Sequence, residues 1–105
     1  MNESGFSIPL PNVTALRVRY LKDRGRILRF VVQLEALIDQ VWTPIVRYNN
    51  AHHFVHRDDL KPDGSQVKTP PMAFASNEDA FNFALQDLRT NFHFYIERYE
   101  RWRTE

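Results

Sequence analysis

The chain has 105 residues, 43% of them hydrophobic and 26% charged, with no cysteine and a formal net charge of +1. This length suits a single domain, the apolar share excludes a disordered chain, and the absence of cysteine excludes disulfides and thiolate chemistry. No apolar run approaches the roughly 20 residues of a membrane span, and the first residues lack the pattern of a secretion signal. We therefore expect a cytoplasmic protein that does not enter membranes.

The first part of the chain is predicted to be a flexible segment followed by two strands. Residues 1–12 combine glycine and proline with polar side chains and show no periodicity, so we expect a flexible lead-in to one domain at residues 13–105. Apolar and polar residues then alternate in residues 13–22 and 26–38. This alternation predicts two antiparallel strands, each with one apolar and one polar face.

The turn between these strands sets their predicted register. A three-residue turn at residues 23–25 places Tyr20 opposite Leu28 and Arg19 opposite Arg29. Like charges on facing residues destabilise a sheet unless an anion covers them. The hairpin formed by these two strands, which we call the basic hairpin, is therefore a candidate surface for nucleic acid or an acidic partner. The alternative is that the arginines extend into water and discourage aggregation.

Three shorter elements and a long helix are predicted next. Residues 41–48 form a third strand, in which Pro44 indicates an edge or a bulge because proline cannot donate to a neighbouring strand. A turn at residues 61–65 separates a short fourth and fifth strand. Ser76 is a good N-cap for a helix that ends near residue 102.

The predicted helix has one apolar stripe. Its members are spaced alternately by four and three residues, namely Phe81, Leu85, Leu88, Phe92, Tyr95, Tyr99 and Trp102. The fold class is therefore α+β, an antiparallel meander of four to five strands packed against one long C-terminal helix. Phe83 and Phe94 lie outside this stripe and mark either a homodimer or partner surface on the helix or a wider core.

A histidine-rich segment is the main candidate for chemistry. Residues 47–58 contain three of the four histidines together with arginine and tyrosine. Imidazole can donate or accept a proton near neutral pH, and arginine can hold a phosphate, which are the requirements of metal-free phosphodiester cleavage. The predicted catalytic residues are His52, His56 and Arg57, and the predicted substrate-binding residues are Arg47, Tyr48, His53, Arg19 and Arg29.

Two other interpretations apply to the same segment. It could be a polar strand end whose histidines bind backbone groups and whose arginines pair with aspartates. His52 and His56 also have the i, i+4 spacing of zinc ligands on a helix, but a strand is expected here and no further ligands complete the set. We therefore predict no metal and no cofactor.

The motif from Arg47 to His53, read as Arg-Tyr-Asn-Asn-Ala-His-His and followed by His56 and Arg57, resembles a segment of known toxins. It is similar to a group of small bacterial proteins that includes TumE-like toxins of toxin-antitoxin pairs. The resemblance implies a curved antiparallel sheet with one helix, a cognate antitoxin-like protein as partner, and action on RNA.

These observations give two functional hypotheses. The first is a toxin-like protein that cleaves RNA, with His52 and His56 as general base and acid and with Arg47 and Arg57 holding the phosphate. The second is a non-enzymatic module that binds a protein or a nucleic acid through the basic hairpin or the aromatic helix.

Overall fold

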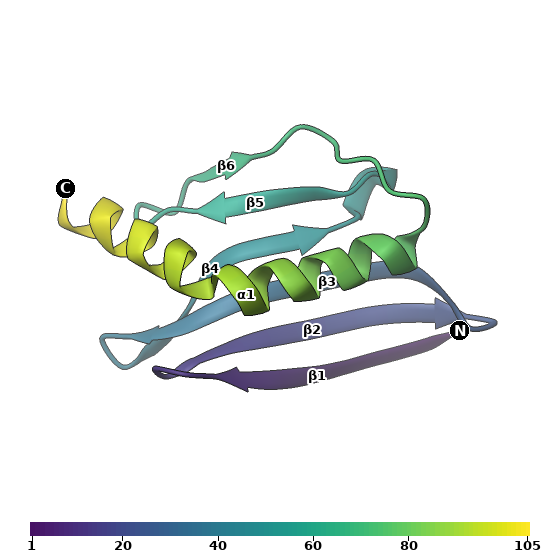
Figure 1. The fold of residues 1–105 in the computed structure, drawn as a ribbon, viewed down its shortest axis with the longest axis horizontal. Helices are drawn as coiled ribbons and strands as arrows, with labels where there is room; N and C mark the ends of the chain where they lie inside the picture. The colour runs from purple at the N-terminus through teal and green to yellow at the C-terminus, as the bar shows by residue number, and fades with distance from the viewer.

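The computed structural model describes residues 1–105 as one antiparallel sheet with a long helix on one of its faces (Figure 1). The six strands lie in the order in which they occur in the chain, which is a meander. The elements are β1 (Asn2–Leu10), β2 (Thr14–Asp23), β3 (Arg26–Ile38), β4 (Val41–Asn49), the 3-10 turn η1 (Ala51–His53), β5 (His56–Leu60), β6 (Gln66–Lys68) and α1 (Asn77–Thr104). The predicted α+β meander with one C-terminal helix is confirmed, with one strand more than expected.

The additional strand is β1, at the position where a flexible lead-in was predicted. Residues Asn2–Leu10 pair with β2 along their whole length, with Phe6 opposite Val18. Gly5 and Pro9 interrupt the alternation in the sequence, and a Cβ at Gly5 would lie in tight contact, 3.1 Å from the carbonyl oxygen of Val18. The prediction of a flexible segment was therefore wrong.

The register of β2 and β3 differs from the predicted one by two residues. Tyr20 faces Phe30 instead of Leu28, and Arg19 faces Val31 instead of Arg29. Two irregularities each contribute one residue of this shift. Asp23 pairs with Arg26, so the predicted three-residue turn is a two-residue turn, and a bulge opposite Leu21 and Lys22 adds one residue to β3. A shift of two residues keeps each side chain on its predicted face, except near the bulge.

The bulge also changes which residue of β3 is buried at its start. Ile27 is buried, whereas Leu28 is 42% exposed. Two residues at the start of α1 bind the backbone of Ile27. Its amide donates to Glu78 Oε1 at 2.7 Å, and its carbonyl accepts from Asn77 Nδ2 at 2.8 Å. The first turn of the helix is thus attached to the beginning of β3.

The remaining strands follow the sequence pattern. Pro44 lies at a bulge between β3 and β4, as predicted, and β5 pairs only with Val46–Asn49, so Pro44 has no strand on its other side. The predicted turn after β5 leads into β6. Every strand in the sheet is therefore accounted for by alternation or by a recognised turn, apart from β1.

The helix α1 begins as predicted, with Ser76 Oγ accepting a hydrogen bond from the amide of Asp79 at 3.1 Å. Its buried side chains are Ala80, Ala84, Leu88, Phe92, Tyr95 and Tyr99. They pack against Leu16, Val18, Phe30, Val32, Leu34, Val46 and Tyr48 of the sheet. No helix of the chain is both long and apolar enough to cross a lipid bilayer.

Phe83 and Phe94 are half exposed on the flanks of α1. The ring of Phe83 contacts those of Tyr48 and Phe74, and the ring of Phe94 contacts Tyr95. These contacts extend the core sideways, while 44% of Phe83 and 55% of Phe94 still face solvent. A homodimer through the helix stays a prediction.

The sheet therefore has two unlike faces. The face under α1, which we call the covered face, carries the core residues named above. The opposite face, which we call the open face, has no element packed on it (Figure 1). Polar residues of β2 to β6 alternate onto the open face, and the candidate functional residues divide between the two faces.

Candidate functional site

The open face carries most of the basic side chains of the sheet. Pairing of the strands places five basic and three acidic side chains there, namely Arg17, Arg19, Arg29, Arg47, Lys68, Glu3, Glu35 and Asp58. The arginines come from three adjacent strands, β2, β3 and β4. The basic surface is thus a property of the whole face and extends beyond the predicted hairpin.

The acids of this face are placed differently from its arginines. Arg17 Nε lies 2.8 Å from Glu35 Oε1, yet the Arg17 side chain is 60% exposed and that of Glu35 only 8%. Asp58 is buried as well. Glu35 and Asp58 are buried and Glu3 is the one exposed acid of this face, so the surface presented to solvent is more basic than the count of charges suggests.

Arg29 and Arg47 of this face form no ion pair with an acid, and Arg19 forms only a long one. Arg19 is 69% exposed, and its contact with the exposed Glu3 is long, at 3.4 Å. Arg29 is exposed and forms no ion pair. Arg47 donates to the side chain of Gln33 at 2.8 Å, which keeps its charge available. An anion would find at least two free guanidinium groups here.

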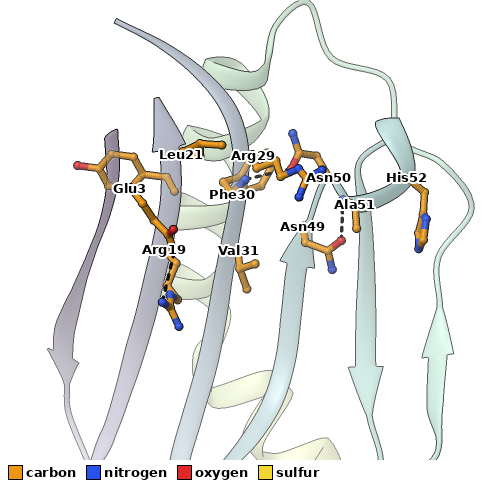
Figure 2. A pocket seen from close by; sticks show the side chains of 11 residues that line it. Glu3, Arg19, Leu21, Arg29, Phe30, Val31, Asn49, Asn50, Ala51 and His52 are labelled. Carbon is orange, nitrogen blue, oxygen red and sulfur yellow. Dashed lines mark hydrogen bonds and ion pairs between the residues drawn. The ribbon is translucent and has the colours of Figure 1, made fainter. Parts of the chain in front are cut away.

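A hollow of about 660 Å³ lies between these residues, at the end of the open face (Figure 2). Figure 2 shows Arg19 and Arg29 on neighbouring strands, with Glu3 at one margin and His52 at the other. The lining residues are Glu3, Arg19, Tyr20, Leu21, Arg29, Phe30, Val31, Asn49, Asn50, Ala51 and His52. The fold thus brings three of the predicted site residues, Arg19, Arg29 and His52, to one cavity.

Asn49 and Asn50 form part of the wall of the hollow. Asn50 Oδ1 accepts from the amide of Phe30 at 3.0 Å, and its Nδ2 donates to the carbonyl of Leu28 at 3.0 Å, so this side chain continues the pairing of β4 with β3. Asn49 Oδ1 accepts from the amide of Ala51 at 3.0 Å. These bonds fix the point at which the chain leaves the sheet.

His52 and His53 follow in η1, and both have a left-handed backbone. Their φ angles are +64° and +70°, a conformation that costs free energy for residues other than glycine. Both imidazoles are exposed and line a second, wider depression of about 1110 Å³, which they share with Arg29 and Phe54. The two exposed imidazoles and the unpaired Arg29 therefore line one depression.

His56 is separated from these histidines by burial. Its side chain is 2% exposed, lies 5.5 Å from the ring of Phe54 between centroids, and places Nε2 3.5 Å from Asp58 Oδ2. Its Nδ1 and the other oxygen of Asp58 have no hydrogen-bond partner. His56 therefore lies on the open face but beneath its surface, where a substrate does not reach it.

Arg57 and Tyr48 lie on the other side of the sheet, under α1. Arg57 donates to both carboxylate oxygens of Asp59, at 2.9 and 3.2 Å, and to the hydroxyl of Tyr95 at 3.2 Å. Tyr48 and Tyr95 both donate to Asp87 Oδ2, each at 2.7 Å. These five residues form a polar network between the helix and the sheet.

The network raises the pKa of Tyr48, Tyr95 and Arg57. Burial and the hydrogen bond to Asp87 raise the pKa of Tyr95 to about 12 and raise the pKa of Tyr48 as well. Burial lowers the pKa of the Arg57 guanidinium, but the bonds to Asp59 and the proximity of Tyr95 outweigh this and raise it. Such groups neither gain nor lose protons near neutral pH, so the network is structural.

Sequence reasoning did not find Asp59, Asp87, Tyr95 or Arg98 as members of this network. Arg98 contributes an ion pair to Asp59 Oδ2 at 3.1 Å. Asp87 could have been noticed, because it follows Ala84 by three residues and precedes Tyr95 by eight, which places a charge beside the apolar stripe. No group of three or more histidine, aspartate or glutamate side chains converges as a metal site would require.

The comparisons place the chain in a family. The family model described as "Domain of unknown function (DUF7718)" matches residues 1–105, the entire chain. The chain belongs to the DUF7718 family. Neither the search of curated proteins nor that of solved structures found a match. The resemblance to TumE-like toxins therefore stays a prediction for this DUF7718 protein.

The structure thus divides the eight predicted site residues of this DUF7718 protein into three groups. Arg19, Arg29 and His52 line the hollow, and His53 lies beside it. Arg47 and His56 lie further along the open face, the first accessible and the second buried. Tyr48 and Arg57 belong to the covered face and bind Asp87 and Asp59 there.

Proposed function

We propose that this protein is a non-enzymatic module that binds RNA on the open face of its sheet. The observation that carries the proposal is the unequal burial of charge on that face, where Arg17, Arg19 and Arg29 are exposed while Glu35 and Asp58 are buried. Phosphates of a nucleic acid would meet Arg19 and Arg29 at the hollow, then Arg17 and Arg47 further along the same face.

The energetic basis is the release of counterions from the nucleic acid. Basic side chains that neutralise phosphates displace bound cations, and this term supplies most of the affinity of binding without sequence preference. The proposed contacts come from rigid strands, so little conformational entropy is lost except in the arginine side chains. The resemblance of residues 47–53 to toxins that act on RNA favours RNA among polyanions.

A charge reversal at Arg29, which forms no ion pair, tests the proposal. Arg29→Glu should weaken binding to a fluorescently labelled RNA, measured by fluorescence anisotropy at low salt. Arg89→Glu is the matched control, since Arg89 is exposed on α1 at the other side of the molecule. Equal affinities of the two variants, or no binding of RNA by the wild type, would reject the open face as the RNA site.

A second candidate function is metal-independent cleavage of RNA. It is favoured by one observation, that His52 and His53 are both exposed and line the same depression as Arg29. Two imidazoles beside a guanidinium are sufficient for general base, general acid and phosphate binding. Because His56 is buried and Arg57 lies under the helix, this form of the hypothesis assigns the proton transfers to His52 and His53.

Cleavage is tested with labelled total RNA in the presence of a chelator. Loss of cleavage in His52→Ala and in His53→Ala, with full cleavage by His93→Ala, supports the second candidate, because removal of a general acid or base costs about 10²- to 10⁴-fold. His93 is a suitable control because it is exposed on the helix. Equal cleavage by all variants indicates a contaminating nuclease, and absence of cleavage leaves the binding module as the function.

A further inference from the structure

Trp42 is an exposed aromatic residue on the open face, at the end remote from the hollow. It lies opposite Leu37, whose neighbours Ala36 and Ile38 face the core. Leu37 and Trp42 therefore point to the uncovered side, and 46% of Trp42 is exposed. Neither residue belongs to the core or packs against it, so core packing does not explain an indole at this position.

The arginines of the open face run along the sheet toward this tryptophan. Arg17 reaches Glu35, which lies two residues before Leu37 on the same side of β3. Eight residues separate Arg29 from Leu37 along β3, which corresponds to about 26 Å of extended strand. The arginines therefore extend from the hollow as far as Arg17 and Arg47, which lie on either side of Gln33, and Glu35 lies between them and the exposed indole.

From this arrangement we infer that the open face holds RNA as a single strand, with its phosphates along the arginines and an unpaired base stacked on Trp42. The inference rests on the proposed function and specifies its ligand. Grooves for single strands combine basic side chains that follow the backbone with aromatic rings that stack on bases. A duplex hides the faces of its bases inside the helix and cannot use Trp42 in this way.

Charge on the open face argues against a second copy of the chain as the occupant. A symmetric contact would bring the exposed arginines of one copy against those of the other, since both copies use the same face. Exposed Arg17 and Arg19 at the surface of both copies would repel each other. A polyanion removes this repulsion, whereas self-association increases it.

The fluorescence of Trp42 provides the test. The chain has two tryptophans, so the protein is used as the Trp102→Phe variant, in which Trp42 is the one indole. Trp102 lies at the end of α1 and is not part of the open face. The variant is titrated with a short single-stranded RNA, with the same RNA annealed to its complement, and with inorganic polyphosphate, which has charge but no bases.

Single-stranded RNA should quench Trp42, whereas duplex RNA and polyphosphate should bind without comparable quenching. In the wild-type background, Trp42→Ala should weaken binding of the single strand roughly 5- to 150-fold, and Trp42→Phe should retain most of the affinity, because stacking on an aromatic ring contributes about 1 to 3 kcal/mol per base. Circular dichroism verifies that the variants fold.

Three results would overturn the inference. The first is equal quenching by polyphosphate. The second is an unchanged affinity of Trp42→Ala for single-stranded RNA. The third is a change of Trp42 fluorescence with protein concentration alone, which would indicate self-association. If RNA still binds in an Arg29-dependent manner in the second case, the proposed function stands and only the stacking role of Trp42 is lost. Absence of all binding would instead reject the proposed function.

Discussion

The phenol of Tyr48 in β4 donates a 2.7 Å hydrogen bond to Oδ2 of Asp87 in α1, across 39 residues of sequence. This bond joins the centre of the sheet to the middle of the helix. It commits one predicted substrate-binding residue, Tyr48, to the covered face, on the other side of the sheet from the exposed arginines of the open face. The polar residues of the sheet are thus divided between a structural network under α1 and the exposed surface of the open face.

Removal of the Asp87 carboxylate should destabilise the fold. Asp87→Ala leaves the hydroxyls of Tyr48 and Tyr95 without their acceptor, and we expect a loss of about 2 to 4 kcal/mol in the free energy of unfolding, because both bonds involve a charged acceptor and buried donors. Urea denaturation measures this loss. The control is Glu97→Ala on the exposed side of α1, where a change within about 0.5 kcal/mol is expected. Equal effects of the two substitutions would contradict the structural role of the network.

The same network predicts how stability depends on alkaline pH. The pKa of Tyr95 is raised to about 12 in the folded protein, whereas in the unfolded chain it is near 10. Between these values the unfolded state has lost a proton that the folded state retains, so the free energy of unfolding should fall as pH rises through this window. Tyr95→Phe should be less sensitive to pH there, as measured by urea denaturation between about pH 9 and pH 11. Parallel pH profiles of variant and wild type would mean that the pKa of Tyr95 is not raised in the folded protein.

The turn between β2 and β3 gives a test that depends on backbone conformation alone. Gly25 has a φ of +77°, and a Cβ at this position would have no heavy atom within 4 Å. Gly25→Ala should therefore cost about 1 kcal/mol through the left-handed conformation and not through a clash. Gly25→Asn should cost less, since asparagine tolerates this region. If alanine is as stable as glycine in thermal unfolding, the turn has another conformation.

The sequence was sufficient to predict the helix and which face of most strands is buried, because both depend on local periodicity. Leu16, Val18, Phe30 and Val32 are buried as their alternation indicated. The exact pairing was not predicted, because the turn is one residue shorter than expected and a bulge beside it adds one residue to β3. The strand β1 was not predicted for a similar reason, since its pairing depends on β2.

The candidate site was predictable as a set of residue types but not as a location. Arg19, Arg29 and His52 were named from sequence, and they line one cavity because the chain turns back after Asn49. Burial of His56 and sequestration of Arg57 depend on Phe54 and Tyr95, which lie against them only in the folded chain. Long-range partners of this kind have no signature in a single sequence.

The salt dependence of RNA binding is the most direct test of the open face as a polyanion site. The double variant Arg19→Gln/Arg29→Gln removes both arginines of the hollow, and Arg89→Gln/Arg101→Gln removes two exposed arginines of the helix as a control. A plot of the logarithm of the binding constant against that of salt concentration should be flatter for the hollow variant by about 1.4, which is about 0.7 for each lost phosphate contact on a single strand. The control should keep the wild-type slope. Equal slopes for all three proteins would contradict RNA binding at the open face.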